Sequence, residues 1–192
     1  MNGDLLANAD LLKALKAWNN KSVDLGVCPP MIYLSQAQNI IEGSLISLGA
    51  QDVSAQLSGA YTGETSAAML LEFGCRYALV GHSERRQYHG ETDLIVAEKF
   101  KAAKLAGLTP VLCIGETQQE REASKTLEVV GRQLKAVVDL VGSAAMANTV
   151  VAYEPVWAIG TGLTASPEEA QEVHAFIRQQ LAGVAQKVQL LY

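Results

Sequence analysis

The sequence contains little cysteine and little histidine, with three residues of each in 192. The cysteines show no paired spacing, and each lies in or beside an apolar run, so we expect reduced, buried thiols. The histidines show no metal-ligand spacing with the cysteines, so we expect no metal site and no other cofactor. The residues concerned are Cys28, Cys75, Cys113, His82, His89 and His174.

There is also no excess of basic residues, because 15 Lys and Arg stand against 20 Asp and Glu, for a formal net charge of -5. A nucleic-acid-binding protein usually carries a basic surface, so that class is not expected. No apolar run reaches membrane-spanning length, and residues 1–4 provide no basic segment before an apolar stretch. The sequence thus predicts a cytoplasmic protein without a membrane partner.

The composition is that of a globular protein, with 49% hydrophobic and 18% charged residues and no low-complexity tract. A chain of 192 residues is long enough to bury a substantial core. We find no linker or internal boundary, so residues 1–192 are predicted to form a single domain.

Apolar, strand-like runs alternate with segments of helical periodicity along the whole chain. The expected strands span residues 22–28, 50–54, 77–80, 109–114, 149–153 and 187–191. The expected helices span residues 10–18, 35–46, 66–73, 93–106, 124–141 and 166–184. Nearly continuous apolar strands between helices indicate an α/β fold with a parallel sheet, either doubly wound or a barrel.

Local signals mark several ends of these helices. Ser35 followed by Gln38 has the spacing of a capping box, and Gly49 is a candidate C-terminal stop. Ser166-Pro167-Glu168-Glu169 combines a Ser cap, a first-turn proline and a Glu three residues after the cap. No Gly-x-Gly-x-x-Gly follows the first strand, which argues against a dinucleotide-binding sheet.

Polar residues gather in or just past four of the expected strands. They are Gln51, His82, Glu116 and Glu154. In a parallel barrel the C-terminal ends of the strands meet on one face, where catalytic residues lie. An imidazole and a carboxylate at these positions are suited to proton transfer next to a carbonyl group.

Four segments in this order resemble triosephosphate isomerases, and the resemblance runs from Met1 to Tyr192. The segments are Gly-Ala-Tyr-Thr-Gly-Glu-Thr-Ser at 59–66, Gly-His-Ser-Glu-Arg-Arg at 81–86, Thr-Pro-Val-Leu-Cys-Ile-Gly-Glu-Thr at 109–117 and Tyr-Glu-Pro-Val-Trp-Ala-Ile-Gly-Thr-Gly at 153–162. The resemblance implies an incomplete (β/α)8 TIM barrel with about six parallel strands, lacking the first and eighth strands of the closed form.

The resemblance also implies an activity, the interconversion of dihydroxyacetone phosphate and D-glyceraldehyde 3-phosphate through an enediol(ate), in glycolysis and gluconeogenesis. Glu154 would be the catalytic base, and His82 would polarise the substrate oxygen and shuttle a proton. A neutral imidazole tuned by a helix N-terminus is the standard description of this very family. The alternatives from the residues alone are a solvated acid and a core histidine bonded to a carbonyl, as we expect for His174.

Further roles follow from the same resemblance. Residues 155–165 would form a mobile lid in which Trp157 and Ile159 provide an apolar cap and the Gly160 amide binds phosphate. Leu163 replaces the family's usual Lys and is expected to alter the hinge. Glu84, Tyr153 and Glu116 would support the site, whereas Arg85 and Arg86 are expected to form structural ion pairs.

A subunit contact is implied as well. The loop at residues 59–65 resembles the interdigitating loop of a homodimer, with Thr62 near its tip reaching the neighbouring site and Gln51 as its docking partner. Asp52 stands where the family usually has Asn and would add a charge to that interface.

Three family elements have no counterpart in this sequence: the Asn-x-Lys strand before Met1, the Gly-Gly-Ser turn after Tyr192 and a later Gly-Gly phosphate loop. The missing Lys would stabilise the enediolate charge, so we expect the 192-residue chain to turn over little substrate. The alternative is a non-catalytic barrel fragment that binds a partner through an open edge or the 59–65 loop. Another phosphosugar barrel enzyme is poorly supported, because a barrel alone does not specify function.

Overall fold

The computed structural model describes residues 2–18 and 22–192. Helices and strands alternate along nearly the whole chain. They are α1 (Leu5–Lys16), β1 (Leu25–Val27), η1 (Met31–Tyr33), α2 (Leu34–Ile41), β2 (Ile46–Ala50), α3 (Ala67–Glu72), β3 (Cys75–Val80), α4 (Ser83–His89), α5 (Asp93–Ala106), β4 (Thr109–Ile114), α6 (Gln118–Glu122), α7 (Thr126–Val141), η2 (Ser143–Met146), β5 (Val150–Tyr153), η3 (Val156–Ala158), α8 (Pro167–Leu181), η4 (Ala182–Lys187) and β6 (Gln189–Leu191).

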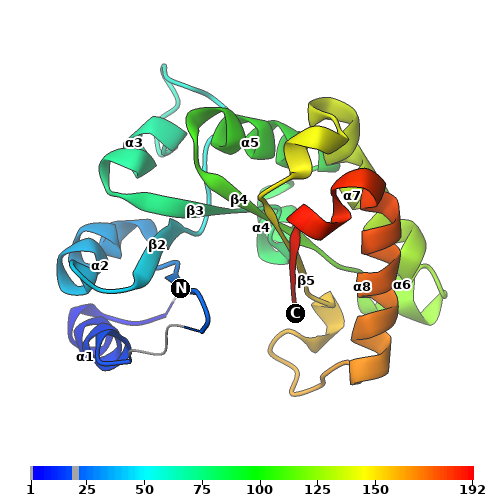
Figure 1. Cartoon of the computed structure of the whole chain (residues 1–192), viewed down its shortest axis with the longest axis horizontal. Helices are drawn as coiled ribbons and strands as arrows, with labels where there is room; N and C mark the ends of the chain where they lie inside the picture. The colour runs from blue at the N-terminus through cyan, green and yellow to red at the C-terminus, as the bar shows by residue number, and fades with distance from the viewer. Residues whose placement is uncertain (1, 19–21) are drawn as a thin grey trace.

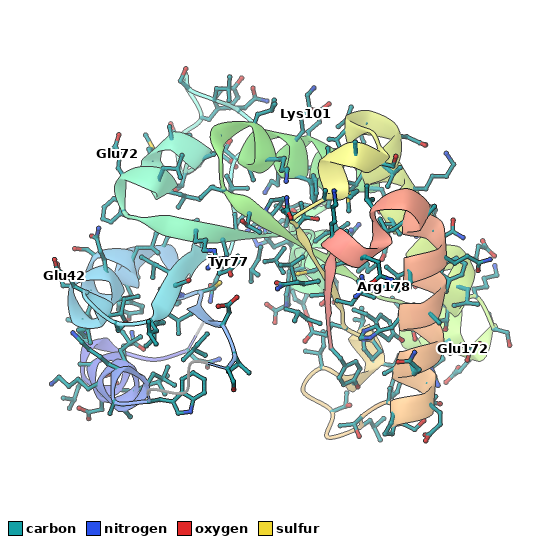
Figure 2. All side chains as sticks on the ribbon, viewed as in Figure 1. Glu42, Glu72, Tyr77, Lys101, Glu172 and Arg178 are labelled. Carbon is teal, nitrogen blue, oxygen red and sulfur yellow. The ribbon has the colours of Figure 1, made fainter. Side chains whose placement is uncertain are left out.

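The strands form one parallel sheet whose order, β1-β2-β3-β4-β5-β6, follows the order of the chain. The sheet curls, and helices α2, α3, α5, α7 and α8 lie around its outside (Figure 1). Charged side chains such as Glu42, Glu72, Lys101 and Glu172 project from that outer layer (Figure 2). The predicted α/β fold, an incomplete TIM barrel with six parallel strands, is confirmed.

The sheet does not close into a ring within the described residues, because β1 and β6 each pair with a single neighbouring strand there. The core lies between the sheet and the helices. Its largest fully buried side chains include Phe100 of α5, Leu112 of β4 and Leu134 of α7. That residues 1–192 form one domain stays a prediction.

Helix α5 has both ends that the sequence predicts, whereas α8 begins as predicted but ends at Leu181 rather than near residue 184. The Thr92 side chain accepts a hydrogen bond from the Ile95 amide at the start of α5, and Gly107 closes the helix in a left-handed conformation with φ 102°. At the start of α8, the side chains of Ser166 and Glu169 form the full capping box around Pro167. In both helices a side-chain cap lies at the predicted start.

Near the N-terminus the predicted boundaries are wrong. Helix α1 begins at Leu5 rather than Asp10, because Asp4 accepts hydrogen bonds from two first-turn amides. Ser35 caps nothing: α2 is entered through the 3-10 turn η1 and lacks a side-chain cap. Gly49 lies inside β2, where a Cβ would stand 2.6 Å from the Cys28 sulfur. Close packing of neighbouring strands, and not a helix end, explains this glycine.

Two short helices, α4 and α6, were not predicted, because each is shorter than two full turns of periodic pattern. The three cysteines are free; Cys75 and Cys113 are buried and Cys28 is half-buried. Burial raises the pKa of Cys28 and of Cys75 to about 11, and that of Cys113 to about 12. Among the described residues, no helix is long and apolar enough to cross a membrane.

Candidate active site

The residues after the parallel strands meet at one edge of the sheet, as the sequence predicts. His82 follows β3, Glu116 follows β4 and Glu154 follows β5. Nε2 of His82 lies 3.5 Å from Oε2 of Glu154, although β4 lies between their two strands. An imidazole and a carboxylate are thus side by side at the edge where parallel barrels carry their catalytic groups.

The orientation of His82 follows from its place at the start of α4. Its Nδ1 accepts a hydrogen bond of 3.3 Å from the Glu84 backbone amide, so the proton of the neutral ring belongs on Nε2. Nε2 is the atom that faces Glu154. The Glu84 carboxylate is exposed and stands 3.9 Å from Nδ1, so its backbone makes the shorter contact with the ring.

Arg85, the next residue of α4, joins a buried cluster of charges behind the site. Lys99 donates to both Asp52 oxygens, at 2.7 and 2.9 Å, and to Oε1 of Glu91 at 2.6 Å. Arg85 contacts the same Glu91 oxygen at 2.6 Å and Asp52 at 3.0 Å. Asp52 is therefore paired with two cations and does not stand as a lone charge at a surface.

The pKa values of the two carboxyl groups in this cluster, Asp52 and Glu91, shift in opposite directions. Burial raises the pKa of Asp52, and the bonds from Lys99 and Arg85 only partly offset it. Burial also acts to raise the pKa of Glu91, but the hydrogen bonds from Lys99 and Arg85 outweigh it and leave that pKa below its usual value. Arg86 donates to Gly81 O and Asp93, so the predicted structural pairing of both arginines is confirmed.

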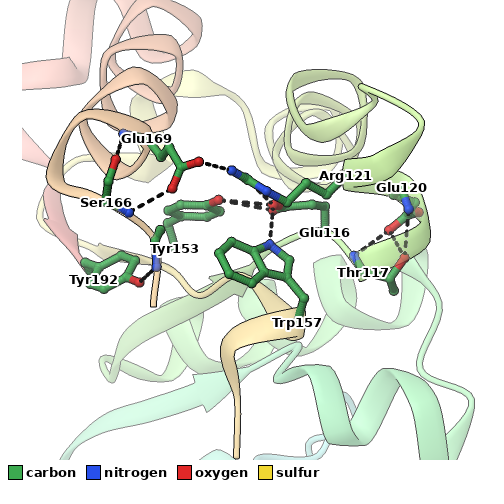
Figure 3. Close-up of polar contacts among 10 residues, drawn as sticks. Glu116, Thr117, Glu120, Arg121, Tyr153, Trp157, Ser166, Glu169 and Tyr192 are labelled. Carbon is green, nitrogen blue, oxygen red and sulfur yellow. Dashed lines mark hydrogen bonds and ion pairs between the residues drawn. The ribbon is translucent and has the colours of Figure 1, made fainter. Parts of the chain in front are cut away.

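Glu116 is fully buried and accepts hydrogen bonds from two aromatic residues, one of them in the predicted lid (Figure 3). The Tyr153 hydroxyl donates to it at 3.2 Å and the Trp157 indole at 2.9 Å, while Arg121 lies 3.5 Å away. Burial, followed by the neighbouring Glu116 carboxylate, raises the pKa of Tyr153. The structure thus brings two of the three predicted supporting residues, Glu116 and Tyr153, together with the predicted lid tryptophan. The third, Glu84, lies beside His82 instead.

The lid segment, residues 155–165, begins with the 3-10 turn η3 and then runs over the surface. Gly160 and Gly162 have φ values of 69° and 78°, the left-handed region that favours glycine. The lid ends where the Ala165 amide donates to the Tyr192 hydroxyl at 3.0 Å. Leu163, the residue that departs from the family pattern, is 56% exposed.

A cleft of about 760 Å³ opens beside His82. Its lining includes Asn2, Gln51, Arg85 and Ile159 of the lid. Gln51 donates to the Cys28 carbonyl at 3.0 Å, whereas Thr62 is exposed in the loop that projects beyond α3 (Figure 1). The predicted contact between Gln51 and the Thr62 loop is one between two subunits, and it stays a prediction.

Sequence reasoning missed Arg121, Glu91 and Lys99, which organise the surroundings of the site. Only a charge pattern on the five-residue helix α6 could have indicated Arg121. His174 contacts the Leu191 carbonyl at 3.3 Å, as expected, whereas His89 is the last residue of α4. No cluster that could hold a metal occurs in the part of the chain that the structure describes.

Comparison with known proteins gives a consistent result. The family model for triosephosphate isomerase matches residues 1–192. Triosephosphate isomerases of Paracidovorax citrulli and Delftia acidovorans are both 60% identical to the chain, and that of Dechloromonas aromatica is 58% identical. Each alignment covers 100% of this chain and 79% of the relative. The chain therefore belongs to the triosephosphate isomerase family.

Proposed function

We propose that the chain is an isomerase that interconverts dihydroxyacetone phosphate and D-glyceraldehyde 3-phosphate, a step of glycolysis and gluconeogenesis. The observation that carries this proposal is the 3.5 Å approach of the His82 Nε2 to the Glu154 carboxylate at the strand ends. The membership of the family and the triosephosphate isomerase names of the relatives support it.

In this mechanism, Glu154 removes a proton from the carbon next to the substrate carbonyl and returns it to the neighbouring carbon. His82 donates its Nε2 proton to the carbonyl oxygen and takes the hydroxyl proton from the adjacent oxygen. The substrate passes through an enediol(ate) between these two transfers. The Glu84 amide keeps Nδ1 as the acceptor, which leaves Nε2–H aimed at the substrate. No atom is gained or lost, as an isomerisation requires.

The lid excludes water from this chemistry in our proposal. Trp157 and Ile159 cover the substrate, and the Gly160 amide binds its phosphate. Glu116 and Tyr153 support the lid from below through the indole of Trp157. Ile159 already lines the cleft beside His82, which fits a covering role.

We further propose that the protein is a cytoplasmic homodimer. The exposed Thr62 loop would reach the partner's site, with Gln51 beside it at the cleft. Asp52 contributes little free charge to such an interface, because Lys99 and Arg85 neutralise it.

Turnover by the 192-residue chain is expected to be slow. None of the described residues that line the cleft is a lysine, and Arg85, which does line it, is already paired with Asp52 and Glu91. A missing electrostatic partner for a developing oxyanion costs about a hundredfold or more in rate.

Hydrogen–deuterium exchange tests the proposal more sensitively than turnover. The chain is incubated with dihydroxyacetone phosphate in D₂O, and loss of the hydroxymethyl proton signal is followed by NMR. We expect Glu154→Gln to lower the exchange rate by about a hundredfold, the usual contribution of a positioned base. Glu172→Gln, an exposed change on α8, should exchange like the wild type. Equal rates for wild type and Glu154→Gln would contradict the assignment of the base.

The non-catalytic alternative has one observation in its favour. Within the described residues, β1 and β6 each leave one strand edge unpaired, and such edges accept an added strand. The exchange experiment separates the two functions, because a binding fragment gives no exchange above the buffer rate.

A further inference from the structure

A single guanidinium group contacts both the start of the lid and the helix that follows it. The central carbon of the Arg121 guanidinium lies 4.6 Å from the centroid of the Trp157 ring, near the start of the lid. The same group forms an ion pair with Glu169, in the first turn of α8 directly after the lid. Figure 3 shows Arg121 reaching across from α6 to both partners. Arg121 thus connects α6, the lid and α8.

Glu169 uses both of its carboxylate oxygens. Oε2 accepts the Ser166 amide at 2.8 Å and completes the capping box of α8, while Oε1 binds Arg121. Glutamine can also fill the third position of a capping box, so the cap alone does not require a negative charge. The charge of Glu169 has a separate effect, which is to fix the position of Arg121.

The position of Arg121 matters to the lid because of what the guanidinium covers. It lies over the face of the Trp157 ring, where a cation is attracted to the aromatic electrons. It also lies 3.5 Å from Glu116, the buried acceptor of the Trp157 indole. A planar guanidinium held from two sides keeps its stacking geometry at a lower cost in side-chain entropy.

We propose that Glu169 is a positioning residue that holds Trp157, through Arg121, in the conformation seen here. Release of the lid from this position then requires the Arg121 bridge between α6 and α8 to loosen. The link to catalysis rests on the proposed isomerase function, whereas the tether itself is a property of Trp157 that is measured without turnover.

Fluorescence quenching of Trp157 tests the tether. The chain has two tryptophans, so Trp18→Phe leaves Trp157 as the sole tryptophan. Acrylamide is the quencher, because it is uncharged and does not respond to the lost charge. Exposed ion pairs shift equilibria by up to about fivefold, so we expect Glu169→Gln to raise the quencher-accessible fraction of Trp157 about two- to fivefold. Glu168→Gln, one residue earlier and exposed, should leave the fraction unchanged.

A second route breaks the same bridge from the other side. Arg121→Gln should raise Trp157 accessibility at least as much, and adding Glu169→Gln to it should cause no further rise, because the two residues act through one contact. Far-UV circular dichroism establishes that each variant is folded. The proposed tether is overturned if acrylamide quenches Trp157 equally in Glu169→Gln and in the wild type, or if the two substitutions raise Trp157 accessibility additively. Absence of proton exchange in the wild type would contradict the proposed isomerase function, but it would not affect the quenching evidence for the tether.

Discussion

At the scale of single residues, Gly115 decides how Glu154 approaches the site. Its amide donates to the Gln133 side chain at 2.9 Å, and its carbonyl accepts from the same side chain at 3.1 Å, so α7 fixes its backbone. A Cβ at Gly115 would overlap the carbonyl oxygen of Glu154. The absence of a side chain after β4 therefore lets the backbone after β5 lie against it.

Gly115→Ala is expected to displace the Glu154 backbone. Overpacking of this kind costs about 1–3 kcal/mol of stability, and proton exchange should fall further because the carboxylate moves away from His82. Urea unfolding and the D₂O exchange assay measure the two effects. Gly183→Ala is the control, because a Cβ there meets nothing within 4 Å. An alanine variant with unchanged stability and exchange would show that the strand ends adjust freely.

At the scale of elements, the cluster of Asp52, Arg85, Glu91 and Lys99 joins three segments. Asp52 follows β2, Arg85 belongs to α4 and Lys99 to α5, while Glu91 lies in the connection between the two helices. Lys99 and Glu91 are almost completely buried, so their charges depend on one another. The cluster holds α4, and with it His82, against the neighbouring elements.

Glu91→Gln should therefore lower the free energy of unfolding by about 3 kcal/mol at pH 7, as expected when one partner of a buried ion pair is removed. The pKa of Glu91 is lowered in the folded state, so its contribution is present above its usual pKa of 4.5 and is lost as the pH falls through the lower folded value. The difference in stability between the wild type and Glu91→Gln should therefore become smaller below pH 4.5. The raised pKa of Asp52 acts in the opposite sense, because its protonation favours the folded state.

Urea unfolding of the wild type and of Glu91→Gln between pH 7 and pH 3 measures this difference. Glu72→Gln, an exposed change at the end of α3, should have little effect at any pH. A gap between wild type and Glu91→Gln that stays constant down to pH 3 would show that the charge of Glu91 is not its source.

Elements also show how far the sequence alone predicts this molecule. The starts of the long helices α5 and α8 could be predicted from local signals. A side-chain cap alone was not sufficient, because α1 and α6 are also capped and were mispredicted or missed. Gly49 was misassigned because its role depends on Cys28, directly after the neighbouring strand β1, a contact that no local pattern contains. His82 and Glu154 were identified by their motifs, but the ion pairs of Arg121 and Lys99 bring together residues distant in the sequence.

At the scale of the whole molecule, the projecting loop that carries Thr62 is the feature best placed for contact with a second copy (Figure 1). Its side chains Leu57 and Tyr61 are 71% and 47% exposed, which is costly for apolar groups without a partner. A homodimer would cover them.

Thr62→Arg should therefore weaken dimerisation, because the loop tip would carry a long cation into a tightly packed contact. Sedimentation velocity over a range of concentrations is expected to show a dimer for the wild type and a larger monomer fraction for the variant. Gln119→Arg adds the same charge on exposed α6 and should sediment like the wild type. A wild type that is monomeric at every concentration would rule out the proposed homodimer.

The order of the strands has a kinetic consequence. Within the described residues, each strand after β1 pairs with the strand that precedes it in the chain, and no pairing skips a strand. Every new strand and helix can thus add to a surface already formed, with only the intervening crossover to close each time, which limits the entropic barrier of each step. Synthesis on the ribosome delivers the units in the same sequence, so the chain can assemble by accretion from its N-terminal end while it is still being made.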